Sequence, residues 1–134
     1  MKKPIYQVLI ALFVIATIII AVIWTNPLLK SPDNIRKKIL REIPIGTSMT
    51  ETEQLIENKS NWTIQHISYE HGYGIDINNT PLEDGKTTVG SKYMRIHLGE
   101  YSFVLSTTDV IAYLGFDENS NLIDVSIRKD IDSF

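Results

Sequence analysis

Three histidines are the side chains in this sequence best suited to metal binding or acid–base chemistry: His66, His71 and His97. A protein zinc site needs three or four convergent ligands, usually with one closely spaced pair among them. His66 and His71 are five positions apart, which places them on opposite faces of an extended strand. The sequence holds no cysteine to complete a ligand set. We therefore predict no metal site and no cofactor.

The sequence carries none of the common motifs of hydrolases and nucleotide-binding enzymes. It contains no G-x-S-x-G, no H-E-x-x-H and no phosphate-binding G-K-[ST]. Glu51 and Glu53 are explained as first-turn acids of a helix, and Asp117 and Glu118 belong to a polar turn. We expect no enzyme activity and no catalytic residues. A small metal-dependent envelope enzyme or sensor that uses the histidines is retained only as an alternative.

The segment 69–74 is the densest polar and aromatic cluster, and it forms the first candidate binding site. Tyr69, His71 and Tyr73 lie in this segment together with Gly72 and Gly74. Tyrosine offers a large contact area with a polar tip, and such loops often recognise a partner. The alternative is a glycine-rich turn whose tyrosines rest on the edge of a sheet.

The second candidate is one face of the strand predicted at 92–98. Tyr93, Arg95 and His97 point to this face, while the apolar residues between them point to the other. An open sheet face of this composition can bind a protein or a peptide. Its simpler interpretation is the solvated side of an antiparallel sheet. Both candidate sites imply a protein or peptide partner.

The first 30 residues differ in character from the rest of the chain. The segment 5–24 is a run of 20 residues without a charged side chain, and a helix of that length spans about 30 Å, the thickness of a bilayer core. A cleaved signal has a shorter apolar stretch, about 7–15 residues, and small residues at its cleavage site. We prefer an uncleaved anchor and divide the chain into a short N-terminal tail (1–4), a transmembrane signal anchor (5–24), a linker (25–31) and an extracytoplasmic α+β domain (32–134).

The charge distribution bears on orientation and on partners. Lys2 and Lys3 favour a cytoplasmic N-terminus, whereas basic residues directly after the run oppose it. We expect a single-pass protein of the cell membrane with its domain outside, and the bilayer as partner of residues 5–24. The net charge is −3 for the whole chain and −8 for residues 46–134, which argues against nucleic acid as a partner.

Capping residues predict two short helices. Ser31, Pro32 and Asp33 begin the first one, which ends near Glu42. The second begins at a capping box with Ser48 as its first residue and ends within 58–61.

Alternation then predicts strands at 63–70, 92–98, 101–106, 110–116 and 122–128. A tight connection is placed at Gly99 and Glu100, and a polar hairpin turn at 117–121. The segment 71–91 is expected to be a long irregular loop with room for one short strand at 74–77. The predicted fold class is α+β: an N-terminal transmembrane helix, then two short helices packed on a four- to five-stranded antiparallel meander.

Two segments carry a resemblance to known families. IGTSMTETE (45–53) is a glycine turn that leads into a capped helix, and GFDENSNLIDV (115–125) looks like a final hairpin. In this order they resemble the SmpA/OmlA-type outer-membrane assembly lipoproteins and the β-lactamase-inhibitor-protein domains. The chain also resembles uncharacterised signal-anchored proteins of Bacillus-like bacteria. It departs from the lipoproteins because it lacks their lipidated cysteine.

The resemblance implies a non-enzymatic interaction domain in a bacterial envelope. A bacterial source also fits the frequent use of isoleucine, lysine and asparagine, which is typical of AT-rich genomes. We therefore expect a membrane-anchored extracytoplasmic protein-interaction domain. The alternative in the same class is an enzyme inhibitor or immunity-type protein, for which the acidic body would suit a basic target.

Overall fold

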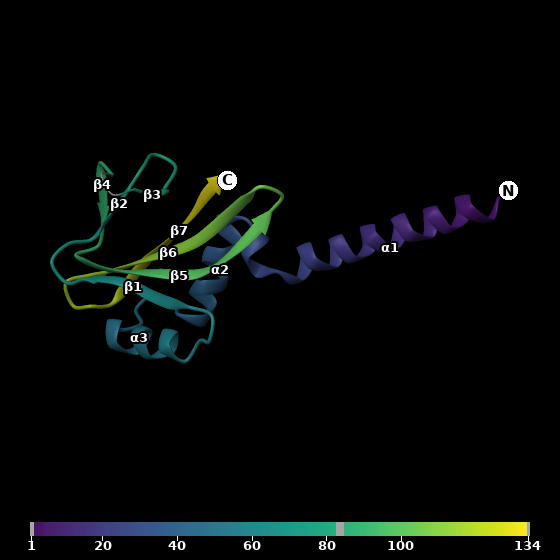
Figure 1. Cartoon of the computed structure of the whole chain (residues 1–134). Coiled ribbons are helices and arrows are strands. Elements are labelled where there is room, and N and C mark those ends of the chain that lie inside the picture. Colours follow the sequence, from purple (N-terminus) through teal and green to yellow (C-terminus); the bar gives the residue numbers. More distant parts are fainter. Residues whose placement is uncertain (1, 83–84, 134) are drawn as a thin grey trace.

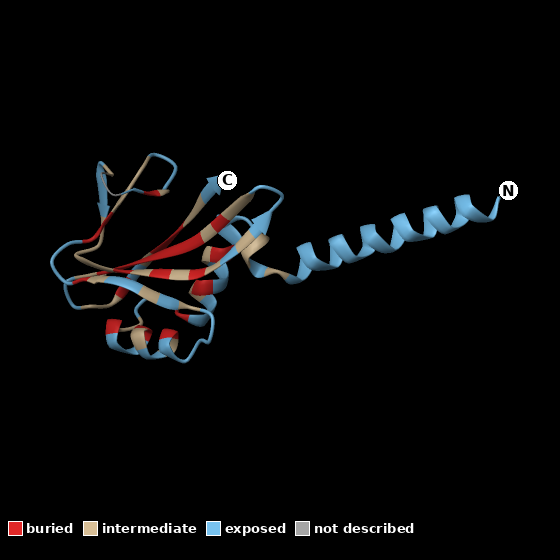
Figure 2. Cartoon of the chain, viewed as in Figure 1, coloured by how far each residue is buried: buried red, intermediate tan, exposed pale blue. Residues whose placement is uncertain are grey.

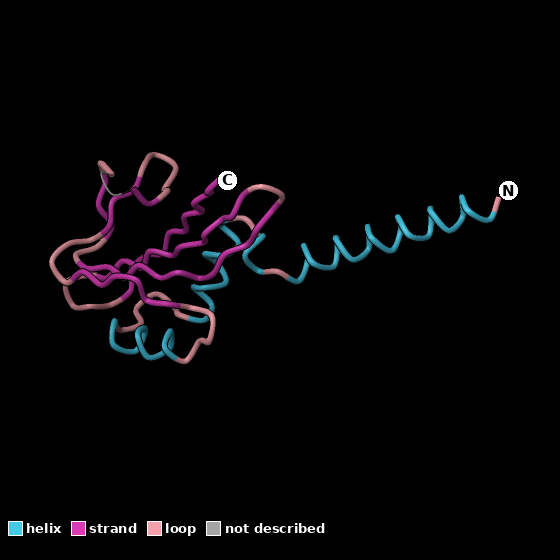
Figure 3. The backbone as a smooth tube through the Cα atoms, in the orientation of Figure 1, coloured by secondary structure: helices cyan, strands magenta, loops and turns pink. Residues whose placement is uncertain are grey.

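The computed structural model describes residues 2–82 and 85–133 (Figure 1). A long N-terminal helix comes first, two shorter helices follow, and the remaining elements are strands (Figure 3). In chain order the elements are α1 (Lys3–Thr25), the 3-10 helix η1 (Pro27–Leu29), α2 (Pro32–Glu42), α3 (Met49–Glu57), β1 (Thr63–Ser68), β2 (Tyr73–Ile75), β3 (Pro81–Leu82), β4 (Thr87–Val89), β5 (Lys92–Phe103), β6 (Ser106–Phe116) and β7 (Leu122–Ser133).

The strands form two antiparallel sheets. The larger sheet has four strands in the order β1-β5-β6-β7, so its last three form a meander. The smaller sheet has the order β3-β2-β4 and stands above one end of the larger sheet (Figure 1). The predicted α+β class is confirmed.

Local signals explain where the two short helices begin. The Ser31 Oγ accepts a hydrogen bond from the Asn34 N–H at 3.3 Å, and the Ser48 Oγ accepts one from the Glu51 N–H at 3.2 Å. Each bond satisfies a backbone donor that has no partner inside the helix. Both predicted helix starts are therefore confirmed.

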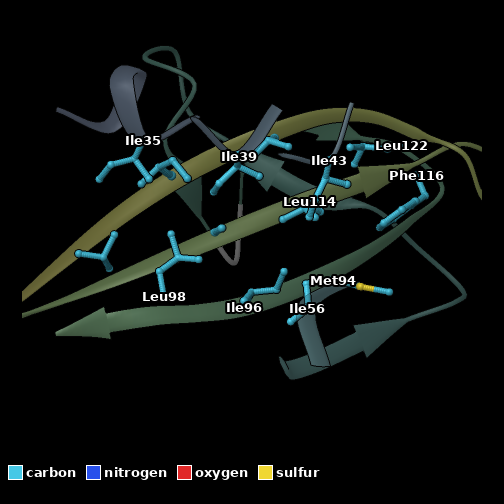
Figure 4. Close-up of a cluster of buried hydrophobic side chains, with 14 of the residues drawn as sticks. Ile35, Ile39, Ile43, Ile56, Met94, Ile96, Leu98, Leu114, Phe116 and Leu122 are labelled. Atoms are coloured by element: carbon cyan, nitrogen blue, oxygen red, sulfur yellow. The ribbon is translucent and has the colours of Figure 1, made fainter. Parts of the chain in front are cut away.

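One face of the four-stranded sheet is closed by α2 and α3. Ile35 and Ile39 of α2, Ile43 directly after it, and Ile56 of α3 pack on the apolar face of the sheet (Figure 4). The predicted alternation in β5 is confirmed, because its inward-facing residues are buried and belong to this core: Met94, Ile96 and Leu98. Figure 2 shows buried positions along the strands of the large sheet and on α2 and α3, and a second buried cluster joins Tyr73 to Ile111 and Tyr113.

The tight connection expected at Gly99 and Glu100 is wrong. The β5 strand continues through both residues to Phe103, with an irregular register between His97 and Gly99. Gly99 adopts a φ of +141°, and a Cβ placed on it would lie 2.9 Å from Leu28 Cδ1. Glycine is needed here for a close approach of η1 to the strand, and the turn lies at 104–105 instead.

The segments 71–91 and 25–31 contain more structure than the sequence predicts. Strands β2, β3 and β4 occupy the first, where a mainly irregular loop is expected. The second holds η1, which packs on β5 through Leu28. The Lys129 Nζ also donates to the Leu28 and Lys30 carbonyl oxygens at 2.9 and 2.8 Å. The chain between α1 and α2 is thus held against the domain.

Helix α1 projects away from the domain (Figure 1). It is 23 residues long and apolar enough to span a membrane. None of its described residues is buried by the rest of the chain (Figure 2). A soluble helix needs a polar face, and α1 has none.

Candidate functional site

The face of the large sheet opposite the helices carries a polar hollow of about 440 Å³. Strands β5, β6 and β7 supply most of its charged side chains, because alternate residues of these strands point away from the apolar core. We call it the polar hollow. Its lining residues are Gln65, Arg95, His97, Asp109, Ile111, Arg128, Asp130, Ile131 and Asp132.

Two hydrogen-bonded pairs of side chains organise the hollow. His97 Nε2 lies 2.8 Å from Asp109 Oδ1, which links β5 to β6. The Arg128 Nε donates to Asp130 Oδ1 on the same strand. This hydrogen bond raises the pKa of the Arg128 guanidinium, so its charge is permanent at any physiological pH.

Arg95 is the unpaired cation of this surface. Its guanidinium carbon lies 5.9 Å from the centre of the Tyr113 ring, a cation–π distance. Its Nε is buried and has no hydrogen-bond partner among residues 2–82 and 85–133. Within the same residues it forms no ion pair, although Asp109 and Asp130 line the same hollow. Within the described residues, the Arg95 guanidinium thus has no carboxylate partner.

An aromatic cluster borders the hollow, with Tyr93 at its centre. The Tyr93 ring lies 5.5 to 6.1 Å from the rings of His66, His71, Tyr73 and Tyr113. Such tilted and stacked pairs gain contact energy beyond their buried area. These ring contacts connect β2 and the His71 turn to the large sheet.

Tyr73 belongs to this cluster as a structural residue. It is only 3% exposed, and its hydroxyl lies 2.8 Å from the Ser126 Oγ. Burial raises the pKa of the Tyr73 phenol well above its usual value of 10. Its side chain holds the small sheet on the large one and does not reach solvent.

The structure brings five of the six predicted site residues together. Tyr93, Arg95 and His97 share the open face, and His71 and Tyr73 contact Tyr93 from the small-sheet side. Tyr69 is 63% exposed and takes no part in these ring contacts.

Sequence reasoning missed Asp109, Tyr113 and Asp130 as parts of this site. Register pairs β6 residues with β5, for example Tyr113 with Arg95, and β7 residues with β6. The polar positions of two consecutive antiparallel strands therefore fall beside the predicted Arg95. This adjacency was the signal that could have extended the site.

The histidines do not lie as expected. The sequence places His66 and His71 on opposite faces, but both imidazoles lie beside the Tyr93 ring, because β1 ends at Ser68 and the chain turns back. His71 Nδ1 lies 3.2 Å from Ser68 Oγ. In the described part of the chain, no group of three or more histidine, aspartate or glutamate side chains could hold a metal ion.

Chemically, the polar hollow is suited to recognition. It offers a planar arginine for bidentate contact with a carboxylate and a histidine–aspartate pair. Comparison with known proteins adds no family: no family model, no curated protein and no solved structure matches this chain with significant similarity.

Proposed function

We propose that this protein is a single-pass membrane protein whose extracytoplasmic α+β domain binds another envelope protein or a peptide through the polar hollow. Two separate parts of the molecule support the proposal. The first is α1, which is fully exposed and would otherwise leave a large apolar surface in water. The second is the hollow with its unpaired Arg95.

Arg95 is the observation that carries the binding function. An arginine N–H that is buried without a partner costs about 1–3 kcal/mol. The fold keeps this arginine at the wall of a hollow whose other basic side chain, Arg128, is already paired. Of the three tyrosines in the aromatic cluster beside it, Tyr93 alone is only half-buried and can offer apolar contact area. Together they favour a partner segment that carries a carboxylate next to an apolar side chain.

Topology is the first test of this proposal. The chain has no cysteine, so Asn119→Cys in the exposed β6–β7 turn introduces a single thiol. We expect a membrane-impermeant maleimide to label intact cells, with the labelled protein in the membrane fraction. Labelling only after lysis would place the domain in the cytoplasm, and labelled protein in the medium would mean that α1 is cleaved. Either result contradicts the proposal.

Site-specific photocrosslinking tests the binding surface in the full chain. A photoreactive residue at position 97, inside the hollow, is expected to give a discrete adduct in native membranes. The same residue at position 57, on exposed Glu57 of α3, is the control and is expected to give none. Arg95→Ala should abolish the adduct, whereas Lys37→Ala, which removes a surface cation outside the hollow, should leave it unchanged. Adducts that survive Arg95→Ala would exclude Arg95 from the interface.

A further inference from the structure

The tip of the β5–β6 hairpin is the most apolar exposed segment of the domain. Phe103, Val104 and Leu105 follow one another at the turn and are 75%, 82% and 71% exposed. Hairpin turns normally use glycine, asparagine, aspartate or serine, whose side chains suit water and whose backbones suit the turn. Three consecutive apolar side chains in this place lack a role in the fold.

The backbone of the tip makes the choice of residues more unusual. Val104 adopts a φ of +53°, in the left-handed region. A β-branched side chain is disfavoured there, and glycine or asparagine would fit better. The sequence thus retains an apolar residue at a position where the turn alone would select a different one.

The tip lies at the end of the domain from which α1 departs. Strand β5 passes Leu28 of η1 at Gly99 and continues to Phe103, about 13 Å farther at the rise of an extended strand. Figure 1 shows the hairpin reaching toward the side where α1 begins to project. Because Lys129 holds the carbonyl oxygens of Leu28 and Lys30, this arrangement is fixed by hydrogen bonds.

Other side chains at this end are those found at membrane–water interfaces. Trp24 is 79% exposed in the last turn of α1, where an interfacial aromatic residue is expected. Beside it lies a hollow of about 500 Å³, lined by three cations, Lys30, Lys38 and Arg41, and by Glu42, whose carboxylate pairs with Lys59. None of these three forms an ion pair within the part of the chain that the structure describes. Such a group attracts the phosphates of lipid headgroups.

We propose that this end of the domain is a lipid-binding surface, in which the 103–105 tip inserts among the headgroups of the bilayer that α1 spans. The inference rests on the proposed anchoring by α1 and adds a second, independent membrane contact. A bilayer is the occupant that fits, because the anchor brings it to this end and because apolar and basic side chains occur there together. Together, α1 and the 103–105 tip then hold the domain in one orientation relative to the bilayer.

Fluorescence quenching in vesicles tests the insertion. The full chain carries a single cysteine, Val104→Cys at the tip or Asn119→Cys in the opposite turn, and each is labelled with an environment-sensitive dye. The vesicles contain phosphatidylcholine, a fraction of which bears a quencher near the top of the acyl chain. We expect quenching of the dye at position 104 that is several-fold stronger than at position 119, together with a blue shift at 104 only.

A matched variant separates the tip from the dye. Phe103→Ser with Leu105→Ser removes the neighbouring apolar side chains, which are exposed and add nothing to the core. The quenching at position 104 should then fall to the level at 119. Quenching that persists in this background would mean that the dye itself inserts, and the proposal would be wrong.

The remaining outcomes distinguish the inference from the proposed anchoring. If the chain floats with the vesicles and resists alkaline extraction, yet 104 and 119 are quenched equally, the tip does not insert while the anchoring stands. If the chain does not stay with the vesicles, the anchoring fails and the inference fails with it. A dye at 104 that is shielded only at high protein-to-lipid ratio, without lipid quenching, would identify a second copy of the chain as the occupant and overturn the proposal.

Discussion

The two ends of the four-stranded sheet are built from opposite kinds of residue. At the end farthest from α1, the turn 117–121 is polar, and the Asp117 Oδ1 accepts a hydrogen bond from the Asn121 N–H at 2.9 Å. At the end next to α1, the turn is made by the exposed apolar side chains of the 103–105 tip. Both turns join neighbouring antiparallel strands of one sheet. The geometry of the sheet therefore does not explain why one turn is polar and the other apolar. We infer that the two turns lie in different surroundings.

The two ends of the sheet also differ in packing, which is tighter at the end farthest from α1. At the far end, α2 and α3 cover one face, and the small sheet covers the other through contacts of Val89 and Tyr73 with Gly115. Phe116 and Leu122 are completely buried there. At the near end, Ser102 and Phe103 are exposed. Phe116 and Leu122 are thus part of the packed core, whereas the 103–105 tip takes no part in it.

Phe116→Ala should produce the largest effect on stability. Removing a fully buried phenylalanine from a packed core costs about 3–5 kcal/mol, because both transfer energy and packing are lost. We expect the free energy of unfolding, measured by urea titration of the full chain in detergent, to fall by this amount. Leu105→Ala at the other end should change it by less than about 0.5 kcal/mol. Similar losses of unfolding free energy in Phe116→Ala and Leu105→Ala would show that both ends of the sheet contribute equally to stability.

Tyr73 allows a smaller, pH-dependent test of the far end. Burial raises the pKa of its phenol in the folded chain above 10, whereas in the unfolded chain the phenol ionises near 10. The stability that this group contributes is fully present below pH 10 and is lost as the pH rises toward the higher folded-state pKa. We expect a decline of up to about 1.4 kcal/mol per pH unit above 10.

In Tyr73→Phe, the free energy of unfolding should fall above pH 10 less steeply than in the wild type, by up to about 1.4 kcal/mol per pH unit. The loss of the hydrogen bond to Ser126 also lowers the stability of this variant at every pH. Tyr69→Phe is the control, since that side chain is exposed. Equal slopes in the wild type and in Tyr73→Phe would show that the small sheet opens before the domain unfolds.

Local chemistry made part of this fold predictable. Capping serines identified the beginnings of α2 and α3, and alternation identified the buried face of β5. The open-face residues Tyr93, Arg95 and His97 followed from the same alternation. These features depend on neighbours in the sequence, and a single sequence records them directly.

The features that were missed depend on contacts between distant residues or on a broken rule. Gly99 looks like a turn residue but serves a close contact with Leu28, which lies on another element. The true turn contains Val104 and carries no turn signal at all. The residues that neighbour Arg95 on β6 and β7 could be found only from the strand register, which the pattern of one strand does not contain. The rule for turns thus fails at the one turn to which we assign a membrane contact.

Val104→Asn should have a small effect of the opposite sign to that of Phe116→Ala. Asparagine tolerates the left-handed backbone better than valine, so we expect the free energy of unfolding in detergent to rise by about 1 kcal/mol. Ser120→Asn is the matched control, because Ser120 has a φ of +62° in the polar turn at the other end. It should stabilise the domain less, since serine already suits a polar turn and also accepts a hydrogen bond from Lys92.

The informative result is the combination of two readouts for the same substitutions. With a dye on Leu105→Cys, Val104→Asn should weaken lipid quenching while the domain becomes more stable, whereas Ser120→Asn should leave quenching unchanged. A gain in stability paired with a loss of lipid contact means that the strained valine is kept for the membrane. If Val104→Asn stabilises the domain and leaves lipid contact intact, the strain at the tip has no function in binding, and the contrast between the two turns reflects only their exposure to solvent.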